Sequence, residues 1–118
     1  MGKKIGVIGG GNMGGAIINS LDRKFKVFVC EKDKQKAAVL RRRLRVPVVE
    51  MKELVDKVDV VILAVKPQDS DDVLSALAQS WTSRKFLISI AAGLTSGYLG
   101  KKLGGKARVV RAMPNMPA

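Results

Sequence analysis

A glycine-rich turn directly after the first apolar run constrains this chain more than any other feature. The run Lys4–Gly9 predicts a strand, and Gly9, Gly11 and Gly14 form the pattern Gly-x-Gly-x-x-Gly. Gly9 allows a tight turn out of the strand, Gly11 lets the backbone approach a pyrophosphate closely, and Gly14 lets the next helix pack against the sheet. That helix begins near Asn12, and its unpaired N–H groups favour an anion in the turn. The pattern indicates a dinucleotide-binding site.

The residues that follow the turn supply the strand–helix–strand unit that this motif requires. Ala16, Ile17 and Leu21 form the apolar face of a helix, and Lys26–Cys30 predicts a second strand. A motif placed between a strand and a helix in this way favours a ligand site. The alternative interpretation is a glycine-rich turn with a purely structural role.

Six apolar runs predict strands, and the segments between them predict helices. The predicted strands are Lys4–Gly9, Lys26–Cys30, Val46–Val49, Val58–Val65, Phe86–Ala91 and Arg108–Met113. The predicted helices are Asn12–Leu21, Asp33–Arg45, Glu50–Lys57, Ser70–Trp81 and Thr95–Leu103. Val58–Val65 is apolar almost throughout, which is typical of a parallel strand covered on both faces. The alternation predicts an α/β fold, a doubly wound and mostly parallel sheet of the Rossmann-like NAD(P)-binding type.

The length and composition fit one domain over residues 1–118, with 47% hydrophobic residues. No apolar run approaches the roughly 20 residues that span a bilayer, and no signal-peptide pattern precedes the first strand. We therefore expect a soluble, cytoplasmic protein with no membrane partner. One cysteine, Cys30, and no histidine exclude a disulfide, a Cys/His zinc site and a histidine triad within one chain. Cys30 is predicted to be a small buried residue rather than a reactive thiol, and no metal site is predicted.

The formal charge of +12 allows a nucleic acid, a phosphorylated ligand or an acidic surface as partner. The basic residues gather in two regions, one in the second predicted helix and one near the end of the sequence. They are Lys32, Lys34, Lys36, Arg41, Arg42, Arg43, Arg45, Lys101, Lys102, Lys106 and Arg108. Only 4% of the residues are aromatic, whereas proteins that bind single-stranded nucleic acids stack bases on aromatic rings. The composition favours a solvated basic face over a nucleic-acid site.

Ligands of doubly wound sheets lie beyond the carboxyl ends of the strands, where the strand order reverses. Glu31 follows the second predicted strand, where a carboxylate accepts hydrogen bonds from ribose hydroxyls and favours NAD; an ordinary surface acid is the alternative. Lys32 and Lys34 could instead receive the 2′-phosphate of NADP. Lys66, held extended before a proline, could lie against the cofactor or in solvent. Ser89–Gly93 leaves room for a flat ring, and the alternative there is close helix–strand packing around its glycine.

Four stretches of the sequence resemble the N-terminal domain of the pyrroline-5-carboxylate reductase family. They are Ile5–Gly14, Val61–Gln68, Ile88–Thr95 and Val110–Ala118. The first is common to dinucleotide-binding folds, and the second and third are more specific. The fourth, Val-Arg-Ala-Met-Pro-Asn-Met-Pro-Ala, is characteristic of the family. Together the four stretches extend over the chain from end to end.

The resemblance implies a site for NADPH or NADH and no catalytic residue within this chain. Ile8–Met13 would wrap the pyrophosphate, and Glu31 would take the adenosine ribose or 2′-phosphate position. Ala64–Pro67 and Ile90–Ala92 would line the nicotinamide half, and Asn115 would lie near the nicotinamide and the substrate. The full predicted set is Ile8, Gly9, Gly10, Gly11, Asn12, Met13, Gly14, Glu31, Lys32, Ala64, Val65, Lys66, Pro67, Ile90, Ala91, Ala92, Gly93 and Asn115.

Two positions depart from the family pattern. Glu31 stands where members often have a small or hydroxyl residue that suits NADPH, so this chain is expected to prefer NADH. Met51 stands where some members place an asparagine against the adenosine, and a methionine cannot replace that polar contact.

The reaction implied by the resemblance is reduction of 1-pyrroline-5-carboxylate to proline by NAD(P)H. The family continues into a helical C-terminal domain that forms the homo-oligomer and binds the substrate. We therefore expect this chain to be a truncated form that binds cofactor and is poorly active alone. One alternative is the domain of a related imine reductase or deazaflavin-dependent NADP reductase. The other is a non-catalytic basic module that binds nucleic acid or has a regulatory binding role.

Overall fold

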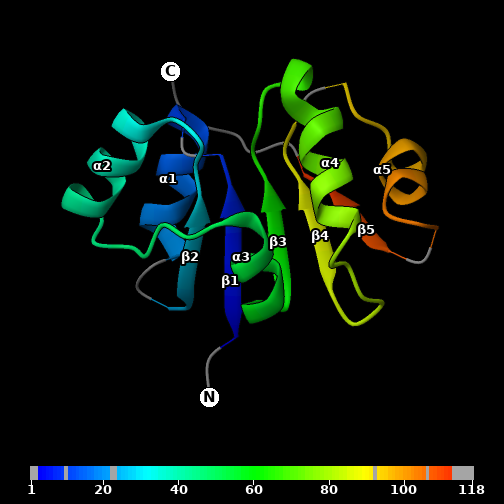
Figure 1. Cartoon of the computed structure of the whole chain (residues 1–118), viewed down its shortest axis with the longest axis horizontal. Helices are drawn as coiled ribbons and strands as arrows, with labels where there is room; N and C mark the ends of the chain where they lie inside the picture. Colours follow the sequence, from blue (N-terminus) through cyan, green and yellow to red (C-terminus); the bar gives the residue numbers. More distant parts are fainter. Residues whose placement is uncertain (1–2, 10, 22–23, 92, 106, 113–118) are drawn as a thin grey trace.

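Five parallel strands form one sheet in the order β2-β1-β3-β4-β5 (Figure 1). The computed structural model describes residues 3–9, 11–21, 24–91, 93–105 and 107–112, and at positions 12 and 13 it describes the backbone alone. The strands are β1 (Lys4–Ile8), β2 (Lys26–Cys30), β3 (Val60–Leu63), β4 (Phe86–Ser89) and β5 (Arg108–Arg111). The predicted α/β class and doubly wound parallel sheet are confirmed.

The predicted strand Val46–Val49 is wrong as a strand, because only an isolated parallel bridge joins Val48 to Val29. The Val29 N–H donates to the Pro47 carbonyl at 2.9 Å, and the Val49 N–H donates to the Val29 carbonyl at 2.7 Å. Pro47 has no N–H with which to extend the ladder. The segment still lies at the outer edge of β2. After β1 the chain therefore adds β2 and this segment on one side of β1, and it then crosses to β3 on the other side.

The helices are α1 (Asn12–Leu21), α2 (Lys34–Arg43), α3 (Met51–Lys57), α4 (Ser70–Ala78) and α5 (Ser96–Lys102). Asp33 and Thr95 cap α2 and α5, because their side-chain oxygens accept backbone N–H groups of the first turn. A 3-10 helix, η1 (Pro67–Asp69), precedes α4 and was not predicted. Pro67 ends the extended backbone at Lys66 and starts this turn, since its fixed φ suits a first helical position.

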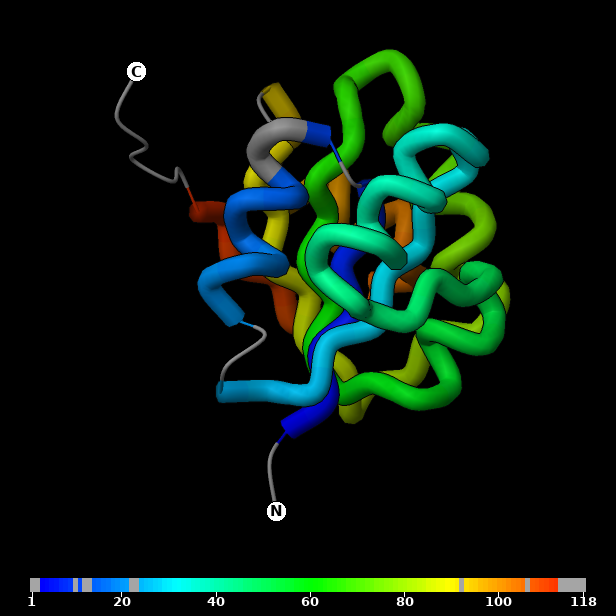
Figure 2. The backbone as a smooth tube through the Cα atoms, turned by 90° about the vertical axis from the view of Figure 1, so that its left-hand side faces the viewer, coloured from blue at the N-terminus to red at the C-terminus, as the bar shows by residue number. Residues whose placement is uncertain are grey.

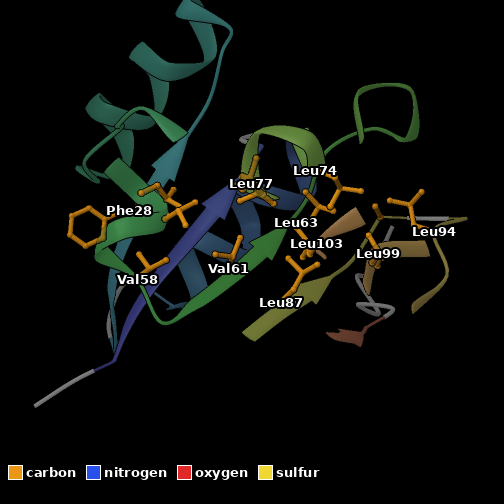
Figure 3. Packing of buried hydrophobic residues seen from close by; sticks show 14 residues of the cluster. Phe28, Val58, Val61, Leu63, Leu74, Leu77, Leu87, Leu94, Leu99 and Leu103 are labelled. Atoms are coloured by element: carbon orange, nitrogen blue, oxygen red, sulfur yellow. The ribbon is translucent and has the colours of Figure 1, made fainter. Parts of the chain in front are cut away.

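Two apolar clusters cover the two faces of the sheet. One contains Ile18 of α1 and Leu40 of α2, packed against the buried residues Val7 and Val29 of β1 and β2. Figure 2 shows α2 near the β2 edge, on the side that faces the viewer. The other cluster joins α3, α4 and α5 to the opposite face of the sheet (Figure 3). Its fully buried members include Leu54, Val55, Val61, Leu63, Leu74, Leu77, Leu87 and Leu99.

The arginines at the end of α2 are exposed, as a solvated basic face requires. Arg41, Arg42 and Arg43 occupy its last turn, where positive charge stabilises the negative end of the helix dipole. None of the helices in the described residues is both long enough and apolar enough to cross a bilayer.

We predict that Val55→Ala destabilises the domain by about 2 kcal/mol, because it removes buried methyl groups from α3. Val39→Ala is the matched control, since Val39 is also helical but 40% exposed, whereas Val55 is fully buried. The expected change for the control is within about 0.5 kcal/mol. Urea denaturation followed by fluorescence of the single tryptophan measures both, and equal midpoints would contradict the assigned core.

Candidate dinucleotide-binding site

A cleft of about 260 Å³ opens at the carboxyl ends of β1, β2 and β3. β1 lies between β2 and β3 in the sheet, and the chain passes from β1 to β2 on one side and later returns to β3 on the other. The cleft therefore lies where the strand order reverses, the place at which such sheets bind their ligands. Its lining residues are Ile8, Gly9, Gly11, Cys30, Glu31, Lys32, Asp33, Lys36, Met51, Ala64, Val65, Lys66, Asp69 and Val73.

Two glycines of the turn have no room for a side chain. Gly9 has φ +100°, and a Cβ built on it would lie 2.7 Å from the Ala64 carbonyl oxygen. A Cβ built on Gly14 would collide with the carbonyl oxygen of Gly9. The Gly9 N–H donates to the Cys30 carbonyl at 3.0 Å, and the Ala64 N–H donates to the Ile8 carbonyl at 2.8 Å. These contacts bring the start of α1 and the ends of β2 and β3 directly against the turn.

Gly11 is the glycine whose missing side chain leaves open space. A Cβ built there meets no described residue within 4 Å, and Gly11 lines the cleft. The first hydrogen bond of α1 runs from the Gly15 N–H to the Gly11 carbonyl at 2.7 Å. The N–H groups between them lie in the first turn, where no intrahelical acceptor exists. The first turn also carries no acidic residue, so the positive end of α1 is not neutralised from within the helix.

The segment after β2 forms a tight acidic turn at one end of the cleft. The Glu31 carboxylate accepts the Asp33 N–H at 2.9 Å. The Asp33 carboxylate in turn accepts the N–H groups of Gln35 at 2.9 Å and Lys36 at 3.1 Å. The hydrogen bond from the Lys36 backbone is the main cause that lowers the pKa of Asp33 below its ordinary value. Asp33 is thus an ionised cap of α2, and the turn holds Glu31 beside it at the cleft.

The segment after β3 forms the facing wall. Lys66 is extended, with φ −69° and ψ 149°, and is exposed at the cleft, as its position before a proline predicts. Ala64 and Val65 lie between Lys66 and the strand and give this wall an apolar surface. Asp69 is the last residue of η1, and it also lines the cleft.

Cys30 lines the cleft and is partly buried. Burial is the largest cause that raises the pKa of its thiol, and the carboxylates of Glu50 and Glu31 raise this pKa further. The thiol is therefore protonated at neutral pH, in agreement with the prediction that it is not activated. No role in the site was predicted for this thiol.

Eight of the predicted residues line this cleft, and several others do not. Those in the lining are Ile8, Gly9, Gly11, Glu31, Lys32, Ala64, Val65 and Lys66. The backbone of Asn12 and Met13 begins α1, Gly14 packs beneath the turn, and Pro67 starts η1. Gly10, Ala92 and Asn115 lie outside the described residues.

Ile90, Ala91 and Gly93 lie at the same edge of the sheet but not in the lining. The Ile90 N–H donates to the Leu63 carbonyl at 3.1 Å, which places the segment after β4 beside the end of β3. Close packing around Gly93, the alternative interpretation, is not seen among the described residues, because a Cβ there would meet none of them within 4 Å. Its φ of +79° explains the glycine instead.

Six described lining residues are outside the predicted set of cofactor-binding residues: Cys30, Asp33, Lys36, Met51, Asp69 and Val73. The resemblance already places Met51 on the adenosine side. Lys36 follows the cap of α2 by three residues, and one helical turn brings it back to the cleft. That spacing was a usable signal. Asp69 and Val73 reach the cleft only because η1 and α4 turn back over the end of β3, which the local sequence pattern did not reveal.

Among the described residues, no three histidine, cysteine, aspartate or glutamate side chains are grouped in a way that could hold a metal ion. The chemistry available to the cleft is instead the binding of a phosphorylated ligand by backbone N–H groups and flanking charges. A parallel sheet, a glycine turn and a cleft at the reversal point define the class of dinucleotide-binding α/β domains.

Comparison with known proteins identifies the family within this class. Residues 4–93 match the family model described as NADP oxidoreductase coenzyme F420-dependent. The chain belongs to this family.

Similar proteins are pyrroline-5-carboxylate reductases. The chain is 37% identical to the enzyme of Escherichia coli K12, with 100% of this chain and 46% of the relative covered. A solved reductase from Coxiella burnetii superposes with TM-score 0.89 at 32% identity, over 99% of this chain and 46% of that one. A pyrroline carboxylate reductase from Plasmodium falciparum with NADP bound gives TM-score 0.81 at 28% identity, over 96% and 42%. The chain therefore spans about half the length of the relatives it matches.

We predict that Gly11→Val abolishes dinucleotide binding while the fold is retained, because the added Cβ occupies the cleft and meets no described residue within 4 Å. Gly97→Val is the matched control, since Gly97 lies in α5 outside the cleft lining and a Cβ built on it also meets none of the described residues within 4 Å. Calorimetric titration with NADH and NADPH measures binding. Unchanged affinity for both in Gly11→Val would refute this assignment of the turn.

We predict slow alkylation of Cys30 by iodoacetamide at pH 7.5, because its raised pKa leaves little thiolate. Glu50→Gln removes a carboxylate that raises this pKa, so alkylation should accelerate by about twofold to fivefold. Glu53→Gln is the control, since Glu53 pairs with Lys57 and does not act on the thiol. Mass spectrometry follows the reaction of the single cysteine. Equal rates in the two variants would contradict the electrostatic cause.

Proposed function

We propose that this chain binds NADPH or NADH in the cleft and forms the cofactor-binding part of a pyrroline-5-carboxylate reductase. One observation carries the cofactor proposal: Gly9 and Gly14 admit no side chain, whereas Gly11 opens directly into the cleft beside the start of α1. A turn with these properties leaves room for a pyrophosphate and aims backbone N–H groups at it. The NADP-bound Plasmodium relative supports the choice of cofactor.

The walls of the cleft suit the two halves of such a cofactor. In the proposed arrangement Glu31 and Lys32, after β2, lie on the adenosine side, and Ala64–Pro67 lie on the nicotinamide side with Ile90–Gly93. The residues outside the described ranges, Gly10, Ala92 and Asn115, keep the roles that the family resemblance implies. Met51 lines the cleft and offers an apolar contact to the adenosine side in place of the amide found in some members.

The reduction of 1-pyrroline-5-carboxylate is proposed for the whole protein rather than for this chain alone, and the similarity to known reductases supports that proposal. Their similarity to this chain extends over nearly all of its length, whereas the family model ends at residue 93. When bound, a reduced nicotinamide supplies a hydride, here to the C=N carbon of 1-pyrroline-5-carboxylate. The residues of this chain hold and orient the cofactor. An imine that arrives already protonated needs no acid from them.

The remaining expectations concern the part of the relatives beyond this chain. We propose that substrate binding and the homo-oligomer depend on that part, and that the isolated chain binds cofactor with little activity. The cytoplasmic location likewise stays a prediction.

A basic nucleic-acid module is the second candidate, and the charge of the cleft does not favour it. Among the described lining residues, three carboxylates (Glu31, Asp33, Asp69) and three ammonium groups (Lys32, Lys36, Lys66) have formal charges that cancel. The net charge of +12 is carried elsewhere. Nucleic-acid binding at those other surfaces would show a steep dependence on salt.

Titration with both reduced cofactors tests the proposal. Trp81, the single tryptophan, packs against the core, and energy transfer from it to a bound reduced nicotinamide reports binding. We expect saturable binding with a dissociation constant in about the micromolar range. Cys30 should also become protected from alkylation, since it lines the cleft. Proline formation is then assayed with the chain joined to a C-terminal part of a relative. Absence of saturation would overturn the cofactor assignment, and saturation without proline formation in the joined protein would overturn only the substrate.

We predict that Glu31→Ser shifts the preference toward NADPH, because it removes a carboxylate that repels a 2′-phosphate. Glu53→Ser, on α3 outside the cleft lining, is the control for loss of one negative charge. The measured quantity is the ratio of the NADH and NADPH dissociation constants. A constant ratio would remove Glu31 from the ribose position.

A further inference from the structure

One ion pair joins the two walls of the cleft. The Lys32 ammonium, after β2, lies 3.4 Å from the Asp69 carboxylate at the end of η1, after β3. Because β1 lies between these two strands, the pair passes across the carboxyl end of β1, where the glycine turn lies. Both residues line the cleft.

The other carboxylates near Lys32 have backbone partners. Glu31 accepts the Asp33 N–H, and Asp33 accepts two N–H groups of the first turn of α2. These bonds hold the turn that carries Lys32, while its side chain extends to the opposite wall. The side chain of Lys32 is 79% exposed, and among the described residues its ammonium pairs with Asp69. The Asp69 carboxylate therefore holds the Lys32 ammonium at the opposite wall of the cleft.

We propose that Asp69 is a specificity-determining residue that reduces selectivity for NADPH by pairing with Lys32. The inference rests on the proposed cofactor site. NADPH differs from NADH by a 2′-phosphate on the adenosine ribose, on the β2 side of such a cleft. A phosphate gains from a nearby ammonium and loses from a nearby carboxylate. With Asp69 in place the pair offers the phosphate no net charge, and without that carboxylate Lys32 can turn to the phosphate.

A cycle of four proteins tests this: the unchanged chain, Asp69→Asn, Lys32→Met and the double variant. Energy transfer from Trp81 gives the affinities for NADPH and NADH. We expect Asp69→Asn to raise the affinity for NADPH by about threefold to fivefold, which is the size of effect expected of an exposed ion pair. The affinity for NADH should change by less than about twofold. In the Lys32→Met background the same substitution should leave the ratio unchanged. Salt should weaken the effect, because the groups are exposed.

Asp72→Asn is the control for loss of one negative charge. Asp72 is an exposed residue of the first turn of α4, and it does not line the cleft. An equal gain for both cofactors, a gain that persists without Lys32, or the same gain in Asp72→Asn would overturn the role of Asp69. Failure of the unchanged chain to bind either cofactor would overturn the cofactor site itself and this inference with it. If the unchanged chain binds cofactor but the ratio of NADPH and NADH affinities is the same in all four proteins, only the inference about Asp69 is overturned.

Discussion

The close approach of backbone to backbone around Gly9 determines where the rest of the site lies. The turn leaves β1 with φ +100° and passes so near the Ala64 carbonyl that no Cβ fits between them. Gly14 then places the first turn of α1 against the Gly9 carbonyl oxygen. With side chains excluded from these contacts, the helix start faces the space between the ends of β2 and β3. The cleft and its N–H donors are consequences of that packing.

The distribution of charge separates the cleft from the rest of the surface. The chain carries twelve excess positive charges, yet the charged side chains of the cleft lining cancel. Any preference for a pyrophosphate therefore depends on backbone N–H groups and on the absence of side chains. In the proposed site, discrimination between related cofactors depends on flanking charges such as Glu31, Lys32 and Asp69. The arginines of α2 stabilise a helix terminus and lie in solvent.

Sequence patterns predicted the parallel sheet and the residues of the turn because these depend on local sterics and side-chain period. They failed at Val46–Val49, where Pro47 limits the ladder to one bridge. Ile90 and Gly93, predicted for the nicotinamide half, lie outside the lining of the cleft, and their cofactor role stays a prediction. Strand ends are easy to locate from a sequence, but the direction in which the following loop turns depends on neighbouring strands. Lys36 was within reach of prediction, since helical spacing from Asp33 returns it to the cleft.

The sequence by itself determined the glycine turn, the alternation of strands and helices, the cap at Asp33 and the extended backbone at Lys66. Each depends on the conformations open to a few consecutive residues. Only the tertiary structure decided that Lys32 meets Asp69, 37 residues further along the chain. That contact requires β1 to lie between β2 and β3, and strand order is set by the packing of the whole sheet between its helices. No local pattern encodes which loops then face each other.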